Sequence, residues 1–534
     1  MRVGVPYLEG LTGANFGFDT NVHIHHNSIT TNGTVEANAG AAGAGGGLSM
    51  CSGTDNYLVD YNFICGNYSM SDGGGIGHIG VSMNGKIKNN QILFNQSYNQ
   101  GSTIHGGGIV VEGESAIAGA LTLGSGDVTI DSNLIQGNFS QAGSGGGIRL
   151  QEVNGSELAR GISWRVDITN NMIVNNVAGW AGGGISLADA VNTNVVNNTI
   201  ASSDSTGLAG PLFTQPTTST ANPAGVSTEP TSPALAALVA ARTQLPAVEQ
   251  KISSPDLNNN IIWKNRSFFV DAKTGTTKLC PSNNVADSVN HTCIPLPAEA
   301  NIGDCSTGAK YWDLGVEGDA SVAPGAVALN PTNSILTSTS GYGGLNLTNA
   351  DPLLAGLYCN GTRAYPGQVF EPGQPFLVPF NMAAALTLDE AGNFVDLRYG
   401  PLTPTGDYRL TLDSPAIDAG STDASNHDFF GTRRPQGSGF DIGAHEILPS
   451  LTLTPTSLNF GNVQVGTTSP AQTRVSRRIK LLLPSRFAWS PQCSGSARDP
   501  GSRHSSSCSR FHSRPSEQSG SSTSPAITSA PLCW

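Results

Sequence analysis

Apolar residues recur in the first half of the chain in short segments with an alternating pattern, such as Val128-x-Ile130 and Val166-x-Ile168. An apolar residue at every second position predicts a β-strand with one buried face. Such strands are followed by an Asn-x-Ile-x-x-Asn motif, whose last Asn is replaced in one copy. The copies are Asn27–Asn32, Asn62–Asn67, Asn90–Asn95, Asn133–Asn138, Asn171–Asn176, Asn198–Ser203 and Asn260–Asn265.

A second marker, three glycines and an aliphatic residue, alternates with the first. It occurs at Gly45–Leu48, Gly73–Ile76, Gly106–Ile109, Gly145–Ile148 and Gly182–Ile185. Two markers that repeat in step predict a solenoid, because a strand–turn–strand unit buries its apolar face only by stacking. The glycines would form sharp bends. The alternative, a phosphate-binding loop, is disfavoured because these glycines precede strands and no Lys-Ser/Thr follows.

The Asn markers predict hydrogen bonds from turn to turn. Parallel strands lie about 4.8 Å apart, so Asn side chains at equivalent corners can form a ladder. The predicted fold class is therefore all-β, a right-handed parallel β-helix solenoid.

The spacing between the two markers locates two insertions. The distance from the last glycine to the next motif Asn is 15, 15, 25, 24 and 14 residues in successive repeats. Two adjacent turns thus carry about ten extra residues each, around 112–127 and 151–165, which stacking places side by side on one face. Insertions of this kind often form the binding face of a solenoid.

The predicted binding residues lie in these insertions: Glu112, Glu114, Glu152, Trp164 and Arg165. Carboxylates beside a Trp are typical of a sugar-binding surface, because aromatic rings stack on pyranose rings. The alternative interpretation is two solvated loops, which are commonly charged.

The histidines give no stronger signal. His23 and His25 share a strand face, so a metal pair is conceivable, but no nearby Cys or Glu completes it, and we expect a packing or solvent role. His78 falls in an inward column and is expected in the core. We predict no metal site, no cofactor and no catalytic residue.

The second half departs from the repeat. Residues 204–256 are predicted to be a Pro/Thr-rich insertion with a short helix at Pro233–Arg242. The ladder resumes at Leu257–Asn265, so the solenoid is expected over 1–203 and again over 257–450.

The segment 407–446 resembles the closing segment of bacterial right-handed β-helix proteins of the choice-of-anchor Q type. The matching stretches are Asp407–Leu410, Ser414–Gly420, Asp428–Pro435 and Asp441–Glu446, with His445 where Tyr is common. The resemblance implies a segment that closes the helix, in a secreted or surface-anchored protein. It implies no enzymatic reaction.

A second resemblance begins at Leu451. Residues 451–473 resemble the first strands of the Hydin-like immunoglobulin modules, which include choice-of-anchor D domains and run to about 100 residues as a β-sandwich. The resemblance ends near Thr473, so a truncated module is predicted. Residues 474–534 are Ser-, Arg- and Pro-rich, and we expect a disordered tail that a reading-frame shift produced, with a genuine basic tail as the alternative.

Charge and cysteine usage limit the partners and the compartment. Before residue 474 the chain has 18 Lys and Arg against 37 Asp and Glu, a balance that disfavours nucleic acid and anionic lipid. No apolar run reaches the roughly 20 residues of a membrane span. Six cysteines precede residue 474, which favours disulfides in an oxidising compartment, with buried free thiols as the alternative at Cys51 and Cys65. We expect an extracellular or cell-surface protein whose signal peptide was lost upstream.

Two functions remain open from the sequence. The first is a non-catalytic carbohydrate binder or adhesin; the alternative is a polysaccharide lyase or glycoside hydrolase with its site in the insertions at 112–127 and 151–165. The NTD, DD and GHG motifs typical of polygalacturonases are absent, and Arg478–Lys480 spells RIK only inside the tail. No strand offers the three carboxylates in register that a calcium-dependent lyase needs. The protein is therefore expected to be non-catalytic, with a polysaccharide as partner and an oligomeric state that the sequence does not specify.

Overall fold

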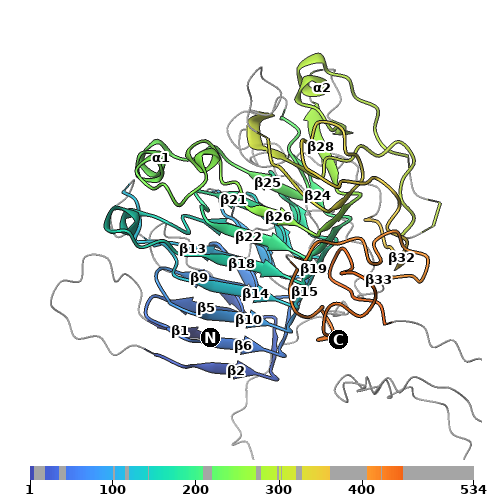
Figure 1. Ribbon diagram of the computed structural model, residues 1–534. Coiled ribbons are helices and arrows are strands. Elements are labelled where there is room, and N and C mark those ends of the chain that lie inside the picture. Colours follow the sequence, from blue (N-terminus) through green and yellow to red (C-terminus); the bar gives the residue numbers. More distant parts are fainter. Residues whose placement is uncertain are drawn as a thin grey trace, which may run out of the picture. The chain divides into compact units, whose positions relative to one another are not determined.

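The computed structural model describes residues 1–4, 19–34, 44–99, 103–114, 120–141, 143–207, 219–271, 273, 278–297, 300–301, 303–319, 328–360, 406–422 and 424–448. These residues form stacked parallel strands in four sheets, which we name A to D (Figure 1).

Sheet A contains β1 (Arg2–Val3), β5 (Leu48–Cys51), β9 (Ile76–Ile79), β13 (Ile109–Glu112), β17 (Ile148–Gln151), β21 (Ile185–Ala188), β25 (Val226–Thr228) and β30 (Leu314–Val316). Sheet B contains β2 (His23–His25), β6 (Leu58–Asp60), β10 (Gly85–Lys88), β14 (Val128–Asp131), β18 (Val166–Thr169), β22 (Thr193–Val196) and β26 (Asp256–Asn258).

Sheet C contains β3 (Ser28–Thr30), β7 (Phe63–Cys65), β11 (Gln91–Leu93), β15 (Leu134–Gln136), β19 (Met172–Val174), β23 (Thr199–Ala201), β27 (Ile261–Trp263) and β31 (Ile335–Leu336). Sheet D contains β4 (Gly33–Thr34), β8 (Tyr68–Ser69), β12 (Gln96–Ser97), β16 (Phe139–Ser140), β20 (Val177–Ala178), β24 (Asp204–Ser205), β28 (Arg266–Asp271) and β29 (Lys278–Pro281).

Strand pairing follows one rule from β1 to β28. Each strand from β5 to β28 pairs in parallel with the strand four places before it, so every circuit of the chain adds one strand to each sheet. The predicted all-β class with parallel strands is confirmed. Only β28–β29 within these sheets is antiparallel among the described strands.

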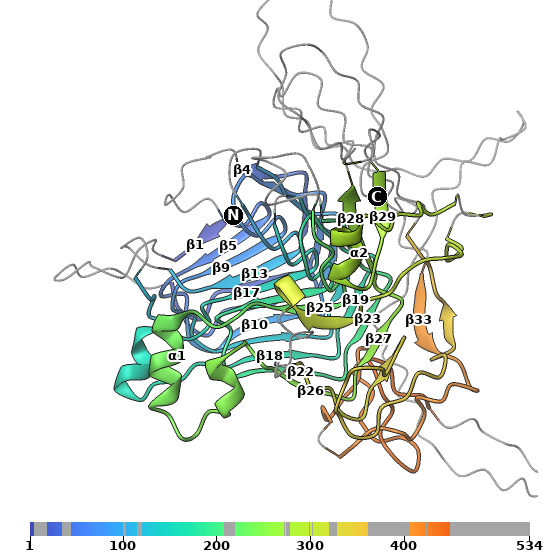
Figure 2. The same ribbon diagram turned by 90° about the horizontal axis from the view of Figure 1, so that it is seen from above.

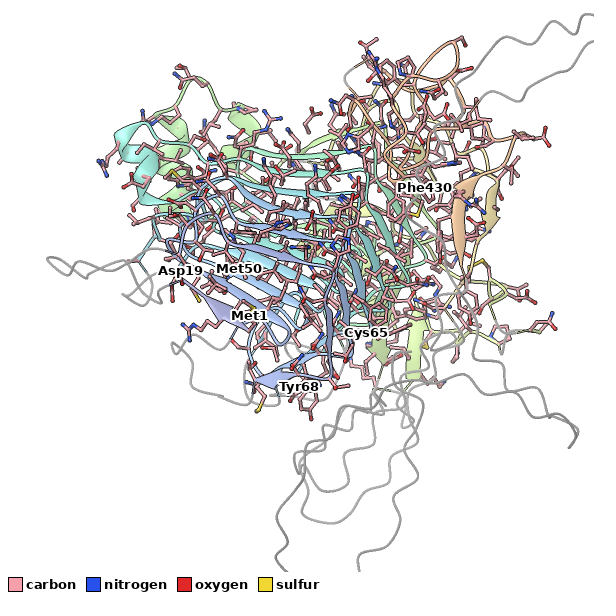
Figure 3. All side chains as sticks on the ribbon, turned by 90° about the horizontal axis from the view of Figure 1, so that it is seen from below. Met1, Asp19, Met50, Cys65, Tyr68 and Phe430 are labelled. Carbon is pink, nitrogen blue, oxygen red and sulfur yellow. A yellow bond between two sulfur atoms is a disulfide. The ribbon has the colours of Figure 1, made fainter. Side chains whose placement is uncertain are left out.

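The core lies between the sheets and is built from the alternating apolar positions. Met50, labelled in Figure 3, is fully buried with Ile130 and Ile168 in one continuous apolar cluster. His78 is also buried there, as predicted, with Nδ1 2.8 Å from the Tyr57 hydroxyl and Nε2 2.8 Å from the Ser125 carbonyl. Burial lowers the pKa of His78 to about 4.

Both positions of the Asn motif form ladders. In the first ladder Oδ1 of Asn133 accepts hydrogen bonds from the backbone N and Nδ2 of Asn90, at 2.9 and 3.0 Å, and Asn133 donates in turn to Asn171. This ladder ends on the Ser334 hydroxyl. In the second ladder Ser203 replaces an Asn, and its N–H still reaches Asn265 at 3.1 Å. The predicted hydrogen bonding between turns is confirmed.

The glycine marker is required where sheet D passes into sheet A. The first glycine of the third copy, Gly106, has a φ of +68°, which side chains disfavour. A Cβ on Gly107 would lie 2.3 Å from the backbone carbon of Phe139 in the next circuit. The glycines therefore permit the bend and the close stacking.

The predicted insertion at 204–256 is only partly an insertion. It contains β24 and β25, and Val226 of β25 is fully buried in the core. The strand is hard to find in the sequence because Pro223-Ala-Gly225 replaces the usual three glycines. The predicted helix is present as α1 (Pro233–Ala240), and the Ser232 side chain accepts a hydrogen bond from Leu235 N.

The segment predicted to close the helix lies along the side of the strands rather than across their end. Its strand β33 (Asp407–Leu410) pairs antiparallel with β32 (Leu354–Gly356). Tyr408, Ala416 and Ile442 pack on the outer face of sheet C, because outward residues of that sheet such as Ile261 are apolar in these circuits. Figure 2 shows β33 and α1 on opposite sides of the sheets.

Polar contacts tie the same segment to four successive circuits. His427 lies 3.0 Å from Asp131, and Ser425 contacts both Asn170 and Asn197. One circuit further, Ser421 N donates to Asn259 at 2.7 Å.

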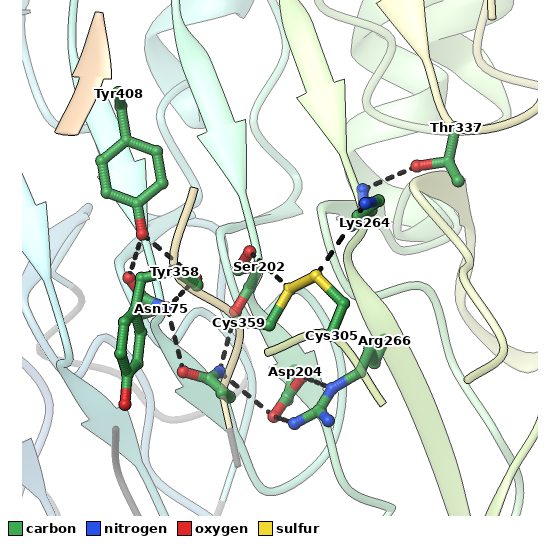
Figure 4. The surroundings of a disulfide bond; sticks show 11 residues. Asn175, Ser202, Asp204, Lys264, Arg266, Cys305, Thr337, Tyr358, Cys359 and Tyr408 are labelled. Atoms are coloured by element: carbon green, nitrogen blue, oxygen red, sulfur yellow. Dashed lines mark hydrogen bonds and ion pairs between the residues drawn. A yellow bond between two sulfur atoms is a disulfide. The ribbon is translucent and has the colours of Figure 1, made fainter. Parts of the chain in front are cut away.

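Two disulfides join the described parts of the second half. Cys280 pairs with Cys293, next to the helix α2 (Val285–Asn290), and Cys305 pairs with Cys359. Figure 4 shows Ser202 beside the second disulfide, where its hydroxyl contacts the Cys359 sulfur. The Asn360 side chain donates to the Ser202 carbonyl at 2.7 Å. Cys51 is a buried free thiol.

Two predictions fall outside the described residues, namely the truncated module at 451–473 and the tail at 474–534. Within the described ranges, no helix combines the length and the apolar character needed to cross a bilayer.

Candidate functional site

The two predicted insertions do lie side by side. Gly124 and Asn154 form an antiparallel bridge between them, and Thr122 accepts a 2.7 Å hydrogen bond from Ser156 N. A third insertion, 229–255 between β25 and β26, joins them. Its α1 packs Leu235 and Val239 against Leu158 of the 3₁₀ helix η1 (Ser156–Arg160). We name residues 120–127, 152–165 and 229–255 the ledge.

Trp164 and Arg165 occupy the edge of the ledge next to sheet B. Trp164 is half-buried against the core, and its indole N–H donates to the Leu123 carbonyl at 3.0 Å. Arg165 is exposed and forms an ion pair with Asp167 at 2.8 Å. Both side chains therefore already have partners within the protein.

The three predicted carboxylates lie together on the sheet A side of the ledge. Burial raises the pKa of Glu112 well above its ordinary value, and the charges of Asp72, Glu114 and Glu152 raise it further. Glu152 accepts a hydrogen bond from Thr122 N at 3.2 Å, while burial raises its pKa. The structure thus separates the predicted residues into an acidic group on sheet A and a pair at sheet B.

The outer face of sheet A carries a buried arginine. Arg149 is the second residue of β17 and is 2% exposed. Its Nη1 donates to Glu229 Oε1 at 2.6 Å and to Ser186 Oγ at 2.7 Å, and its Nη2 donates to Gln151 Oε1 at 3.0 Å. Ser186 is its register partner on β21.

A second carboxylate reaches the same column of residues. Oε1 of Glu317, which directly follows β30, accepts hydrogen bonds from Ser186 at 3.3 Å and Ser227 at 3.1 Å. Burial, and then the neighbouring Glu229 charge, raise the pKa of Glu317 to about 7. We name Arg149, Gln151, Ser186, Ser227, Glu229 and Glu317 the Arg149 network.

Asp72 and His105 line the side of the network next to the glycine bends. The Asp72 carboxylate accepts from His105 N, and His105 Nδ1 accepts from Ser144 N at 3.0 Å. Burial raises the pKa of Asp72 to about 6, against the opposing effects of the His105 N–H and Arg149. Burial and the Arg149 charge lower the pKa of His105, so its imidazole is neutral.

The Arg149 network was not predicted from the sequence. Glu229 and Glu317 lie in segments where the sequence repeat cannot be recognised. They are more than 80 residues apart in the chain, and the pairing of β25 with β30 brings them together. One signal was available: the outward column Ser49, Gly77, Val110, Arg149, Ser186 and Ser227 contains a single charged residue.

The histidine pair His23 and His25 lies on the exposed face of β2, as its strand pattern indicated. His23 Nε2 is 2.7 Å from Asp60, and His25 Nδ1 is 3.0 Å from His26 Nδ1. No group of three His, Cys, Asp or Glu side chains suited to a metal ion occurs in the described part of the chain.

Comparison with known proteins gives no family assignment. No protein-family model matches the chain, and no curated protein matches its sequence.

The raised pKa of Glu317 predicts a pH-dependent loss of stability. Its folded pKa of about 7 exceeds the ordinary 4.5, so ionisation opposes folding, and stability should fall as pH rises from 4.5 through 7. Glu317→Gln keeps an acceptor for both serine hydroxyls but cannot ionise. Its Tm should therefore decrease less between pH 5 and pH 8 than that of the unmodified protein, as measured by scanning calorimetry.

The exposed Asp413 provides the control for this measurement. Asp413→Asn should leave the pH dependence of Tm unchanged. Parallel Tm curves for Glu317→Gln and the unmodified protein would contradict the assigned pKa.

Proposed function

We propose that the chain is a right-handed parallel β-helix protein of the choice-of-anchor Q type that binds a polysaccharide on the outer face of sheet A. The succession of four parallel sheets and the two Asn ladders supports the solenoid. The proposed family membership rests on the matching stretches in 407–446, and the proposed Hydin-like module rests on the resemblance of residues 451–473.

The observation that carries the binding function is the polar surface formed by the Arg149 network and the acidic edge of the ledge. Glu112 and Glu317 are partly exposed and lie close enough to the fixed, buried Arg149 guanidinium to interact electrostatically with it, and the partly exposed Glu152 interacts in the same way with Glu112. Carboxylate, amide and guanidinium groups are strong hydrogen-bonding partners for the hydroxyls of a sugar. Because carboxyl groups outnumber Arg149 here, a neutral or amine-bearing glycan suits the surface better than a polyuronate.

The proposed location is the extracellular space or the cell surface. The two disulfides support an oxidising compartment. The acidic body, with 18 basic and 37 acidic residues before residue 474, supports the proposal that nucleic acid is not a partner.

Binding can be tested with a panel of soluble oligosaccharides: chitosan, cellulose, xylan and laminarin fragments, and oligogalacturonate. We expect at least one neutral or amino-sugar fragment to bind in isothermal titration calorimetry. Glu112→Ala should weaken that binding up to about tenfold, since it removes a hydrogen bond to a sugar hydroxyl and a neutral hydrogen bond contributes roughly 0.5–1.5 kcal/mol. Asp413→Asn, on the C-terminal segment, should bind normally. Absence of binding to every fragment would refute the proposed function.

A further inference from the structure

We propose that the Cys305–Cys359 disulfide is an exchangeable bond that accepts two electrons from a dithiol reductant, while the Cys280–Cys293 disulfide of the same chain stays oxidised. The inference is independent of polysaccharide binding. It assigns a thiol-modification site to the part of the chain that carries β32.

The two disulfides are alike in their accessibility. In each, one cysteine is buried, with exposed fractions of 3% for Cys359 and 0% for Cys280. The other cysteine of each bond, Cys305 or Cys293, is partly exposed. An external thiolate therefore has a similar approach to both bonds. A difference in reactivity has to come from the groups around the sulfur atoms, which decide how well each sulfur leaves as a thiolate.

Two hydrogen-bond donors lie against the sulfur atoms of the Cys305–Cys359 disulfide. Lys264 Nζ is 3.9 Å from Cys305 Sγ, and Ser202 Oγ is 3.8 Å from Cys359 Sγ (Figure 4). A disulfide sulfur carries no hydrogen, so the Ser202 hydroxyl is the donor in its contact. Sulfur is a weak acceptor in the oxidised form. Once the bond opens, the same two donors face a negatively charged thiolate, and they bind it far more strongly.

The Cys280–Cys293 disulfide has different surroundings. Cys280 Sγ lies 3.7 Å from the carbonyl oxygen of Lys278, which has no proton to donate. Cys280 also belongs to an apolar cluster with Ala221 and Phe269, against which Cys293 packs. Apolar surroundings disfavour a thiolate. The two bonds thus differ in the charge that their sulfurs can carry, and they provide an internal comparison within one molecule.

The reaction consists of two thiol–disulfide exchanges. A thiolate of the dithiol bonds to Sγ of the partly exposed Cys305, and the disulfide breaks with its electron pair on Cys359, beside the Ser202 hydroxyl. The second thiolate of the dithiol then bonds to the first, which breaks the mixed disulfide and leaves its electron pair on Cys305, beside Lys264. The dithiol departs as a disulfide, oxidised by two electrons. Its two protons pass through solvent to the two reduced cysteines.

Lys264 favours the reduced form at equilibrium as well as the second step. A lysine beside a cysteine is one of the environments that promote the thiolate near neutral pH. The Lys264 ammonium therefore stabilises Cys305 after reduction more than it stabilises the disulfide before it. A bond whose reduced form is stabilised in this way is a stronger oxidant than an ordinary structural disulfide.

Opening the bond removes a covalent constraint on residues 354–360, which contain β32. Hydrogen bonds still hold this stretch: Cys359 N donates to the Gly303 carbonyl at 3.0 Å, and the Asn360 side chain donates to the Ser202 carbonyl at 2.7 Å. Reduction is therefore expected to loosen residues 354–360 while the four sheets stay intact.

The test equilibrates the full chain at pH 8 in mixtures of reduced and oxidised dithiothreitol, blocks free thiols with N-ethylmaleimide and quantifies each cysteine by peptide mass spectrometry. We expect Cys305 and Cys359 to reach half reduction at a ratio of reduced to oxidised dithiothreitol about tenfold lower than Cys280 and Cys293, which corresponds to roughly 30 mV. Lys264→Met should remove most of this difference. Lys264→Arg keeps the positive charge and should retain it.

The comparison between the two disulfides needs no variant, so it holds even if a substitution at Lys264 disturbs folding. Equal midpoints for the two bonds in the unmodified protein overturn the inference. An unchanged midpoint in a folded Lys264→Met variant also overturns it. Circular dichroism at the midpoint should show intact sheets, and a loss of β-structure there would mean that reduction follows unfolding, contrary to the proposal. None of these outcomes bears on polysaccharide binding.

Discussion

Replacing Asn133 with alanine is expected to lower the free energy of unfolding by about 3–5 kcal/mol. Asn133 lies in the middle of the first ladder and is fully buried. Its removal leaves the Asn90 N–H and the Ile87 carbonyl without the bonds that Asn133 provides. Each buried polar group left unsatisfied costs roughly 1–3 kcal/mol. Urea unfolding followed by circular dichroism measures the change.

The matched control is an asparagine outside the ladders. Asn330 is exposed, and its backbone is not in the left-handed region, so alanine fits there without strain. Asn330→Ala should change the free energy by less than about 1 kcal/mol, as surface substitutions usually do. A similar loss in both variants would mean that the ladder contributes nothing beyond ordinary surface contacts.

Replacing Arg434 with alanine is expected to release the C-terminal segment from the sheets, at a cost of about 3–5 kcal/mol. Arg434 is buried and donates to Glu446 Oε2 at 3.0 Å and to the carbonyls of Asp441 and Gly443 at 2.7 and 2.6 Å. Its loss leaves the fully buried Glu446 carboxylate without its cation. Hydrogen exchange of backbone amides in 406–448 should increase strongly.

The neighbouring Arg433 gives a matched control, because it carries the same charge but is exposed. Arg433→Ala should leave exchange in 406–448 near that of the unmodified protein. If Arg434→Ala also exchanges normally, the buried ion pair does not hold this segment in place.

The repeat could be predicted from the sequence because its signals are local. An alternating strand, the Asn motif and the glycine bend each depend on residues within about 30 positions, and Val128, Asn133 and Gly106 take the predicted roles. The position of the C-terminal segment could not be predicted from the sequence. The segment packs on the apolar outer face of sheet C, and the residues of that face, such as Ile261, look like those of any buried strand.

The candidate site was only partly predictable for a related reason. The carboxylates Glu112, Glu114 and Glu152 were found because their insertions interrupt a measurable spacing. Arg149 was missed because its neighbours along β17 are ordinary strand residues. Its hydrogen-bond partners Ser186 and Glu229 come close to it only when the circuits stack.

The contacts of the C-terminal segment with four successive circuits have a consequence for unfolding. In an array whose units touch only their neighbours, end units can melt one at a time, and the transition broadens. His427, Ser425 and Ser421 instead bind residues of four successive circuits, so that one segment links the circuit of Asp131 to that of Asn259, which it does not touch directly. These circuits are thereby linked as one cooperative unit, so local fraying in this stretch requires detachment of the whole segment.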